Sequence, residues 1–199
     1  MSKKINYDNI IIVKTEQTCW EKDDTNKSDN EIIEIGISLL NLTSLRVHSK
    51  KQYLIKPVNT NISEYCLYKT GLSRESILSS NLTLDNVCQD IIKNYSSQKR
   101  PWATFGDGDR KIIEKQCKKE EVQFPFTSRH INIKTLFPII FKLKGELSLG
   151  EAMLETDLEP TSLREAGVEE CYNIALLLKE IIVGGVASSN LIFKNNRKK

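Results

Sequence analysis

A short, unbroken apolar run near the N-terminus constrains the fold more than any other feature of this sequence. The run, Ile10-Ile11-Ile12-Val13, consists only of β-branched residues. Such side chains favour strands, and a run that is apolar on both faces is typical of a strand buried in the middle of a sheet. The chain is therefore predicted to place a central strand of an α/β sheet close to its N-terminus.

Two further strands are predicted after a polar loop. The loop covers residues 21–30, the strands cover residues 32–40 and 46–55, a turn at 41–44 joins them, and Lys56-Pro57 ends the second. Consecutive strands joined by short turns pair as hairpins. The first three strands are expected to form a meander with hairpin-like links.

Helical periodicity dominates the rest of the chain. Helices are predicted over residues 62–69, 84–92, 109–119, 134–142, 149–156 and 162–183, with short strands at 102–105 and 130–133. Thr83 or Asp85 and, further on, Ser148 can cap helix starts, and Gly71 can end the first helix. Pro138 predicts a kink or break inside its helix. This mixed α/β order is compatible with a ribonuclease H-like sheet, and other folds share it.

Length and composition indicate one folded domain. The chain has 199 residues, of which 39% are hydrophobic, and it contains no internal repeat or low-complexity linker. We expect residues 1–184 to form the domain and residues 185–199 to form a frayed basic tail. The formal charge of +3 is too small to indicate nucleic-acid binding by itself.

The cysteines and the N-terminus exclude several classes of protein. The five cysteines contain no C-x-x-C pair, which disfavours a structural zinc site and indicates reduced, mostly buried thiols. No apolar stretch follows the N-terminus, and no segment reaches the roughly 20 apolar residues of a membrane span. We therefore expect a cytoplasmic protein with no signal peptide and no membrane partner.

Five motifs spread from about Asn9 to Val183 carry a family resemblance. They are Lys14-Thr15-Glu16-Gln17-Thr18-Cys19-Trp20, Glu31-Ile32-Ile33-Glu34-Ile35-Gly36, Cys66-Leu67-Tyr68-Lys69-Thr70-Gly71-Leu72, Phe105-Gly106-Asp107-Gly108-Asp109-Arg110-Lys111 and Glu165-Ala166-Gly167-Val168-Glu169-Glu170. Jointly they resemble the DEDDh 3′–5′ exonucleases, and most closely the branch of RNA exonucleases that trim histone messages and small interfering RNAs. No single motif would suffice.

The resemblance implies a ribonuclease H-like fold, with a mixed five-stranded sheet flanked by helices, and a two-metal centre. In such a centre, carboxylates hold two divalent cations that activate water and stabilise the leaving oxygen. The positions that match the catalytic ones are Glu16, Asp109, Glu165 and Glu170, with Asp107 as a less favoured register for the second carboxylate. The positions that match substrate-binding ones are Gln17, Thr18, Thr70, Gly71 and Leu72.

The departures from the family pattern fall on the metal centre. Lys14 stands where the family has its first Asp, Glu165 stands where it has a His that acts as general base, and Glu170 replaces the last Asp. An ammonium has no lone pair to give a cation. Four family carboxylates supply −4, whereas Lys14 (+1) with three carboxylates (−3) gives −2.

The centre is therefore expected to hold no metal, with Glu16, Asp109 and Glu170 as the residual candidate ligands, and Mg²⁺ or Mn²⁺ as the ion if the protein is active. The hypothesis that follows is that Lys14 replaces the metals from within the chain. Its ammonium would lie among Glu16, Asp109 and Glu170.

Simpler interpretations of these residues remain open. Asp109 could be only a helix N-cap. The acidic residues of the last motif could form a solvated helix face, and their register could be off by one residue. Residues 70–72 could be a helix C-cap and turn rather than a surface that packs against terminal nucleotides. His48 and His130 are interpreted as structural strand residues.

Three functions fit this sequence. The first is an inactive or severely impaired exonuclease-like protein that binds the ends of single-stranded RNA or DNA, or a protein partner, without cutting. The second is an active metal-dependent 3′–5′ exonuclease with an altered site, in which Glu165 serves as base. The third is a protein-interaction subunit of a larger complex.

Overall fold

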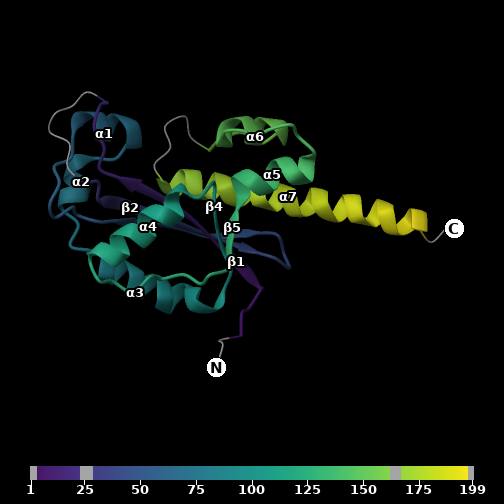
Figure 1. Ribbon diagram of the computed structural model, residues 1–199, viewed down its shortest axis with the longest axis horizontal. Helices are drawn as coiled ribbons and strands as arrows, with labels where there is room; N and C mark the ends of the chain where they lie inside the picture. The colour runs from purple at the N-terminus through teal and green to yellow at the C-terminus, as the bar shows by residue number, and fades with distance from the viewer. Residues whose placement is uncertain (1–3, 23–28, 162–166, 197–199) are drawn as a thin grey trace.

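A five-stranded mixed sheet with helices on both faces forms the body of the protein in the computed structural model (Figure 1). The structure describes residues 4–22, 29–161 and 167–196, with the side chains of the last segment described up to residue 185. The strands are β1 (Asn9–Gln17), β2 (Ile32–Asn41), β3 (Val47–Leu54), β4 (Trp102–Thr104) and β5 (His130–Asn132), in the spatial order β3-β2-β1-β4-β5.

The strand pairing places β1 at the centre of the sheet. β1 pairs antiparallel with β2, and β2 pairs antiparallel with β3, which gives the predicted meander. On its other side β1 pairs parallel with β4, and β4 pairs parallel with β5. The prediction of a mixed five-stranded sheet with a central first strand is confirmed.

The helices begin and end largely where capping residues predict. They are α1 (Glu64–Thr70), α2 (Arg74–Leu78), α3 (Leu84–Tyr95), the 3₁₀ turn η1 (Ser97–Lys99), α4 (Gly108–Lys119), α5 (Ile133–Phe141), α6 (Leu149–Glu155) and α7 (Gly167–Asn196). Thr83 and Ser148 each form a capping box at the start of α3 and α6. Gly71 has a φ of 68°, the left-handed conformation with which it ends α1.

The helices differ from the prediction at three places. The short helix α2 was not predicted. α5 continues past Pro138 to Phe141, so the helix is not ended there, and a kink at the proline stays a prediction. α7 does not end at Val183 but continues to Asn196 and extends beyond the body in Figure 1. Gly184-Gly185 weakens this helix by about 1 kcal/mol per glycine, yet no proline follows to end it.

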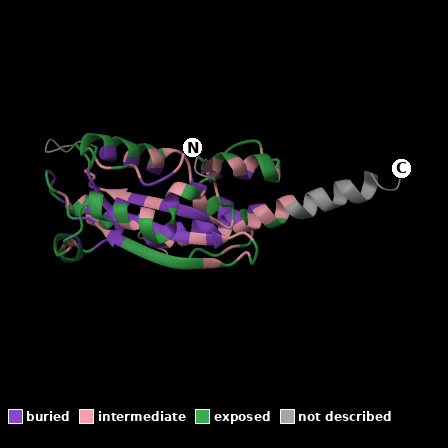
Figure 2. Ribbon diagram, turned by 90° about the horizontal axis from the view of Figure 1, so that it is seen from below, coloured by how far each residue is buried: buried purple, intermediate pink, exposed green. Residues whose placement is uncertain are grey.

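The alternation of β1 explains why its apolar run is unbroken. Ile11 and Val13 pack against residues of α3 and α4, whereas Ile10 and Ile12 pack against residues of α5, α6 and α7. Successive side chains of a strand point to opposite faces, so each half of the run fills one of two cores. Figure 2 shows the buried strands between helices whose outer faces are exposed.

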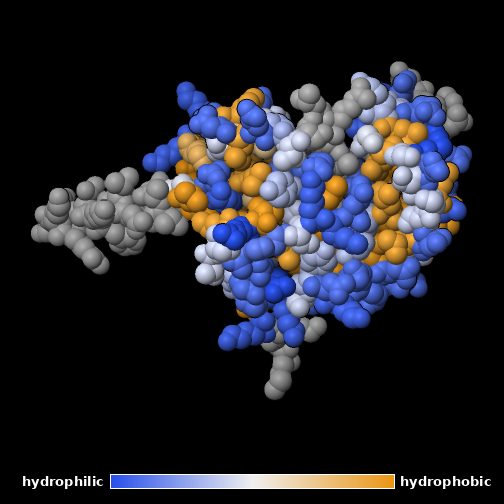
Figure 3. Space-filling model, turned by 180° about the vertical axis from the view of Figure 1, so that it is seen from behind, coloured by the Kyte–Doolittle hydropathy of each residue, from blue (hydrophilic) through white to orange (hydrophobic). Residues whose placement is uncertain are grey.

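The cysteines are mostly buried and unpaired, as the sequence predicts. Four cysteines are buried and Cys19 is half-buried, and all five are free thiols. On the face opposite to that of Figure 1, apolar side chains gather in two areas separated by a band of hydrophilic ones (Figure 3). Within the described part of the chain, no helix combines the length and apolarity needed to cross a membrane.

α7 meets the sheet at unusually close range. A Cβ atom added to Gly36 on β2 would lie 2.8 Å from Val168 Cα and 2.9 Å from the Gly167 carbonyl carbon. Only a glycine leaves room for this approach of a helix backbone to a strand. Gly36 therefore sets how closely the first turn of α7 sits on the sheet.

We predict that Gly36→Ala lowers the free energy of unfolding by about 1–3 kcal/mol, because the added methyl group must displace the α7 backbone. Gly150→Ala is the matched control, since no atom lies within 4 Å of its added Cβ and alanine favours helix α6 by up to about 1 kcal/mol. Urea unfolding of both variants measures the difference. Equal stability of the wild type and Gly36→Ala would contradict the close approach.

Candidate functional site

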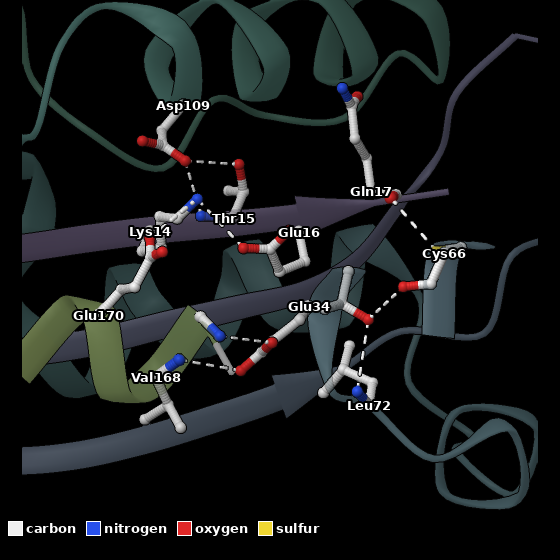
Figure 4. A network of polar contacts seen from close by, with 12 residues as sticks. Lys14, Thr15, Glu16, Gln17, Glu34, Cys66, Leu72, Asp109, Val168 and Glu170 are labelled. Atoms are coloured by element: carbon white, nitrogen blue, oxygen red, sulfur yellow. Dashed lines mark hydrogen bonds and ion pairs between the residues drawn. The ribbon is translucent and has the colours of Figure 1, made fainter. Parts of the chain in front are cut away.

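The last residues of β1 contribute polar side chains to both faces of the sheet. Lys14 and Glu16 lie two residues apart and face α7, whereas Thr15 and Gln17 face α4 (Figure 4). The N-terminal ends of α4 and α7 both reach this end of β1. Three segments far apart in the sequence therefore meet at one place.

A lysine ammonium lies between two carboxylates at the centre of the site. Lys14 Nζ is 3.1 Å from Glu16 Oε1 and 3.1 Å from Glu170 Oε2. The side chains are 21%, 19% and 31% exposed, respectively, so water screens these pairs only in part. The structure thus brings Lys14 together with two of the three carboxylates expected around it.

The neighbouring glutamate of α7 points elsewhere. Glu169 forms an ion pair with Lys50 of β3 and accepts a hydrogen bond of 3.0 Å from the Thr161 hydroxyl. Glu170, not Glu169, therefore faces the end of β1. Glu165, the predicted general base, lies outside the described residues.

Asp109 is the third carboxylate of the site, and β1 holds it in place. Its Oδ1 atom accepts hydrogen bonds from the Thr15 backbone N–H at 2.8 Å and from the Thr15 hydroxyl at 2.9 Å. Asp109 is buried inside the first turn of α4, and Asp107 occupies the N-cap position. The interpretation of Asp109 as a helix N-cap is therefore wrong.

The surroundings of the centre shift the pKa values of Lys14 and Glu16. Burial alone would lower the pKa of Lys14, but the carboxylates of Glu16, Asp109 and Glu170 outweigh it and raise that pKa. Burial raises the pKa of Glu16, and the nearby Glu170 and Glu34 add to this rise against the opposing effect of Lys14. The nearby carboxylates thus favour the charged form of Lys14, whereas burial disfavours the charged form of Glu16.

A buried glutamate that the sequence analysis did not single out anchors the last helix. Glu34 on β2 is fully buried, and its two carboxylate oxygens accept hydrogen bonds of 3.0 Å from the backbone N–H groups of Gly167 and Val168. Gln52 donates a further hydrogen bond of 3.0 Å. A carboxylate at a helix N-terminus satisfies its free N–H groups and complements its dipole. A lone acid in an otherwise apolar strand was the available signal.

The predicted substrate-binding residues lie beside the site but differ in exposure. Thr18 is fully buried and its hydroxyl oxygen accepts a hydrogen bond from the Glu31 N–H. Thr70 and Leu72 are also buried, whereas Gly71 is exposed and Gln17 is half-buried. A contact of Thr18, Thr70 or Leu72 with a nucleic acid stays a prediction.

Both histidines lie away from the Lys14 centre. His130 Nε2 is 2.7 Å from the Thr104 hydroxyl and its ring packs on Trp102. Burial and the nearby Arg110 lower the pKa of His130. His48 is exposed on β3. The contacts of His130 agree with a structural role, whereas the structural interpretation of His48 stays a prediction.

The residues present do not fit a divalent metal centre. An ammonium fills the space between Glu16 and Glu170, and Oδ1 of Asp109 is engaged by Thr15. Mg²⁺ requires close octahedral coordination by oxygen, which this arrangement does not offer. Within the described ranges, no three His, Cys, Asp or Glu residues form a group that could hold a metal ion.

Comparison with known proteins identifies relatives of one kind. The chain is 26% identical over 189 residues to 3′–5′ exoribonuclease 1 of Rattus norvegicus, covering 90% of this chain and 54% of the rat protein. It is 24% identical over 202 residues to ERI1 exoribonuclease 2 of Homo sapiens, covering 90% of this chain and 29% of that protein. The chain thus spans about half or less of these relatives. No family model matches it.

Solved structures share the fold over most of the chain. The nuclease domain of 3′hExo, a DEDDh family member bound to rAMP, superposes with a TM-score of 0.80 at 24% identity, covering 92% of this chain and 95% of that one. Escherichia coli exonuclease I in complex with a dT13 oligonucleotide gives a TM-score of 0.67 at 8% identity, covering 93% of this chain and 43% of that one.

We predict that Lys14→Ala lowers the free energy of unfolding by about 2 kcal/mol at neutral pH, because it leaves Glu16 and Glu170 close together without a counter-charge. The matched control is Lys118→Ala, which removes an exposed lysine of α4 and should change stability by no more than about 0.5 kcal/mol. Unchanged thermal stability of Lys14→Ala would sink the idea that Lys14 holds the centre together.

The stabilising contribution of Lys14 should decrease at high pH. Since the pKa of Lys14 is raised on folding, its stabilising contribution is fully present below the ordinary lysine pKa of about 10.4 and is lost as pH rises through the higher folded value. The stability gap between wild type and Lys14→Ala should therefore stay constant from neutral pH to about pH 10 and narrow above it.

Proposed function

Since this chain is a relative of the 3′–5′ exoribonucleases and has the predicted ribonuclease H-like exonuclease fold, we propose that it is a catalytically inactive exonuclease-like protein that binds single-stranded nucleic-acid ends without cutting them. One observation supports the proposed loss of catalysis. The Lys14 ammonium lies 3.1 Å from both Glu16 and Glu170, in the space between two carboxylates of the centre.

The electrostatic argument against hydrolysis rests on charge and coordination together. Two divalent cations bring +4, and Lys14, Glu16, Asp109 and Glu170 together carry −2. A fixed ammonium also repels a divalent ion at contact range, by several kcal/mol at the effective dielectric of a half-buried site. Hydrolysis that depends on two bound metals has no support from these residues.

The argument for retained binding rests on the fold and its relatives. One structural relative is bound to rAMP and another to a dT13 oligonucleotide. A surface that stacks bases and tracks a phosphate backbone requires no bound metal. Binding without cleavage is therefore compatible with this fold once the centre has lost its ligands.

A second candidate function is that of an interaction subunit, and exposed apolar side chains favour it. Ile139 on α5, Leu154 on α6 and Val183 on α7 are 66%, 70% and 41% exposed. They belong to three helices that pack together next to the projecting end of α7 (Figure 1). A contiguous patch of such groups would suit a protein partner, whereas single exposed apolar residues are common on any surface.

We predict that the purified protein releases no nucleotides from a labelled single-stranded oligonucleotide in the presence of Mg²⁺ or Mn²⁺. In the same buffers it should bind that oligonucleotide in a gel shift that weakens as salt rises. Stepwise shortening of the strand would show instead an active exonuclease with an altered site. A lack of both cleavage and binding would favour the interaction subunit.

Restoring the family residues provides a complementary test. The triple variant Lys14→Asp, Glu165→His, Glu170→Asp should gain Mn²⁺ binding measurable by calorimetry, because it removes the ammonium and restores the missing carboxylate. The double variant Glu165→His, Glu170→Asp keeps Lys14 and should bind no Mn²⁺. Equal Mn²⁺ affinity of the two variants would show that Lys14 is not what excludes the metal.

A further inference from the structure

A cavity of about 660 Å³ lies beside the Lys14 centre, on the other face of the sheet. Residues of α4 form one wall, and the end of β1 with the segments around residues 29–31 and 58–59 forms the other. Cavities of roughly 300–1,000 Å³ are typical of ligand sites. The volume is sufficient for a nucleotide unit.

Lysines line the α4 wall at helical spacing. Lys111, Lys115 and Lys119 follow each other at four-residue intervals and therefore share one face of the helix. Each interval rises about 6 Å along the helix axis, which is comparable with the separation of neighbouring phosphates in an extended strand. Such a row of ammonium groups suits a phosphate backbone.

Two of these three lysines form no direct ion pair with a described residue. Lys119 Nζ lies 3.2 Å from Asp29, whereas Lys111 and Lys115 form no ion pair with another described residue. Lys115 acts on Asp29 only at longer range, where it adds to the effect of Lys119 in lowering the pKa of that carboxyl. Lys111 and Lys115 thus remain available to an anion.

Glu31, one of two acids in the opposite wall, already has hydrogen-bond partners within the protein. Glu31 accepts hydrogen bonds from the backbone N–H groups of Val58 at 3.1 Å and Asn59 at 2.8 Å. Burial would raise the pKa of Glu31, but these bonds and one from Thr60 outweigh it and lower that pKa. These local donors therefore satisfy the Glu31 carboxylate. Of the other two acids that line the cavity, Asp29 is paired with Lys119 and Glu120 lies at the far end of α4.

The cavity adjoins the Lys14 centre through neighbouring residues of β1. Gln17, the residue after Glu16, lines the cavity and points toward α4 in Figure 4. Asp109 belongs to the centre, and Lys115 lies six residues further along the same helix, about 9 Å along its axis. A strand leaving the centre on this side would run directly along the lysines.

We propose that this cavity holds the sugar–phosphate backbone of a single strand whose end lies at the Lys14 centre, with Lys111 and Lys115 each bound to a phosphate. This rests on the proposed function. The centre itself carries a net charge of −2 and does not attract phosphates. The two lysines supply the attraction that the centre lacks.

The test compares two double variants that remove the same charge. Lys111→Ala/Lys115→Ala alters the cavity, and Lys93→Ala/Lys118→Ala removes two exposed lysines outside it. Binding of a fluorescent single-stranded oligonucleotide of about ten nucleotides is followed by anisotropy over a range of salt concentrations. Thermal unfolding of each variant checks that the fold is retained.

Loss of two phosphate contacts should reduce the steepness of log K against log salt by about 1.4, since each contact on a single strand contributes about 0.7. Affinity at low salt should fall by about tenfold or more in the cavity variant, and the control variant should keep the wild-type slope. Wild-type behaviour of the cavity variant, or an equal loss in both variants, overturns this inference alone. Absence of binding by the wild type overturns the proposed function with it.

Discussion

The buried carboxylate of Glu34 ties the longest helix to the middle of the sheet. It accepts the first two N–H groups of α7, and the lack of a side chain at Gly36 lets the helix backbone approach β2 closely enough for these bonds. Because a helix is rigid, fixing its first turn also fixes the direction of the residues one turn later. Glu170 meets Lys14 for this reason, and the charged centre is a consequence of how α7 is seated.

The centre is best understood as a set of acids sharing one internal cation. Glu16 and Glu170 contact the ammonium directly, and Asp109 acts on it from a carboxylate that Thr15 holds. The acids of such a site repel one another unless a positive charge lies among them. Lys14 places a positive charge among these acids at the end of β1.

Local sequence signals predicted those elements whose causes are local. The β-branched run at Ile10 fixed the central strand, and Thr83, Ser148 and Gly71 marked helix ends through side-chain or backbone geometry. The grouping of Lys14 with Glu16 and Glu170 was accessible only through a family resemblance, because no periodicity links residues so far apart.

Features that depend on tertiary contacts escaped prediction. To predict the role of Glu34, one must know that the N-terminus of a helix contacts β2. The sequence of the strand does not contain this information. The sequence could not decide the role of Asp109 for the same reason. An acid near the start of a helix can cap that helix or accept hydrogen bonds from a neighbouring strand. The extent of α7 shows the opposite error, in which two glycines were given more weight than the helix around them.

A cation that is part of the polypeptide cannot dissociate. The ion pairs of Lys14 with Glu16 and Glu170 form as soon as the chain folds, because all three charges belong to the chain. These two pairs therefore need no ion from solution to form. The polypeptide itself supplies a positive charge at this end of the sheet, whereas the charge of a dissociable ion would depend on its concentration in solution.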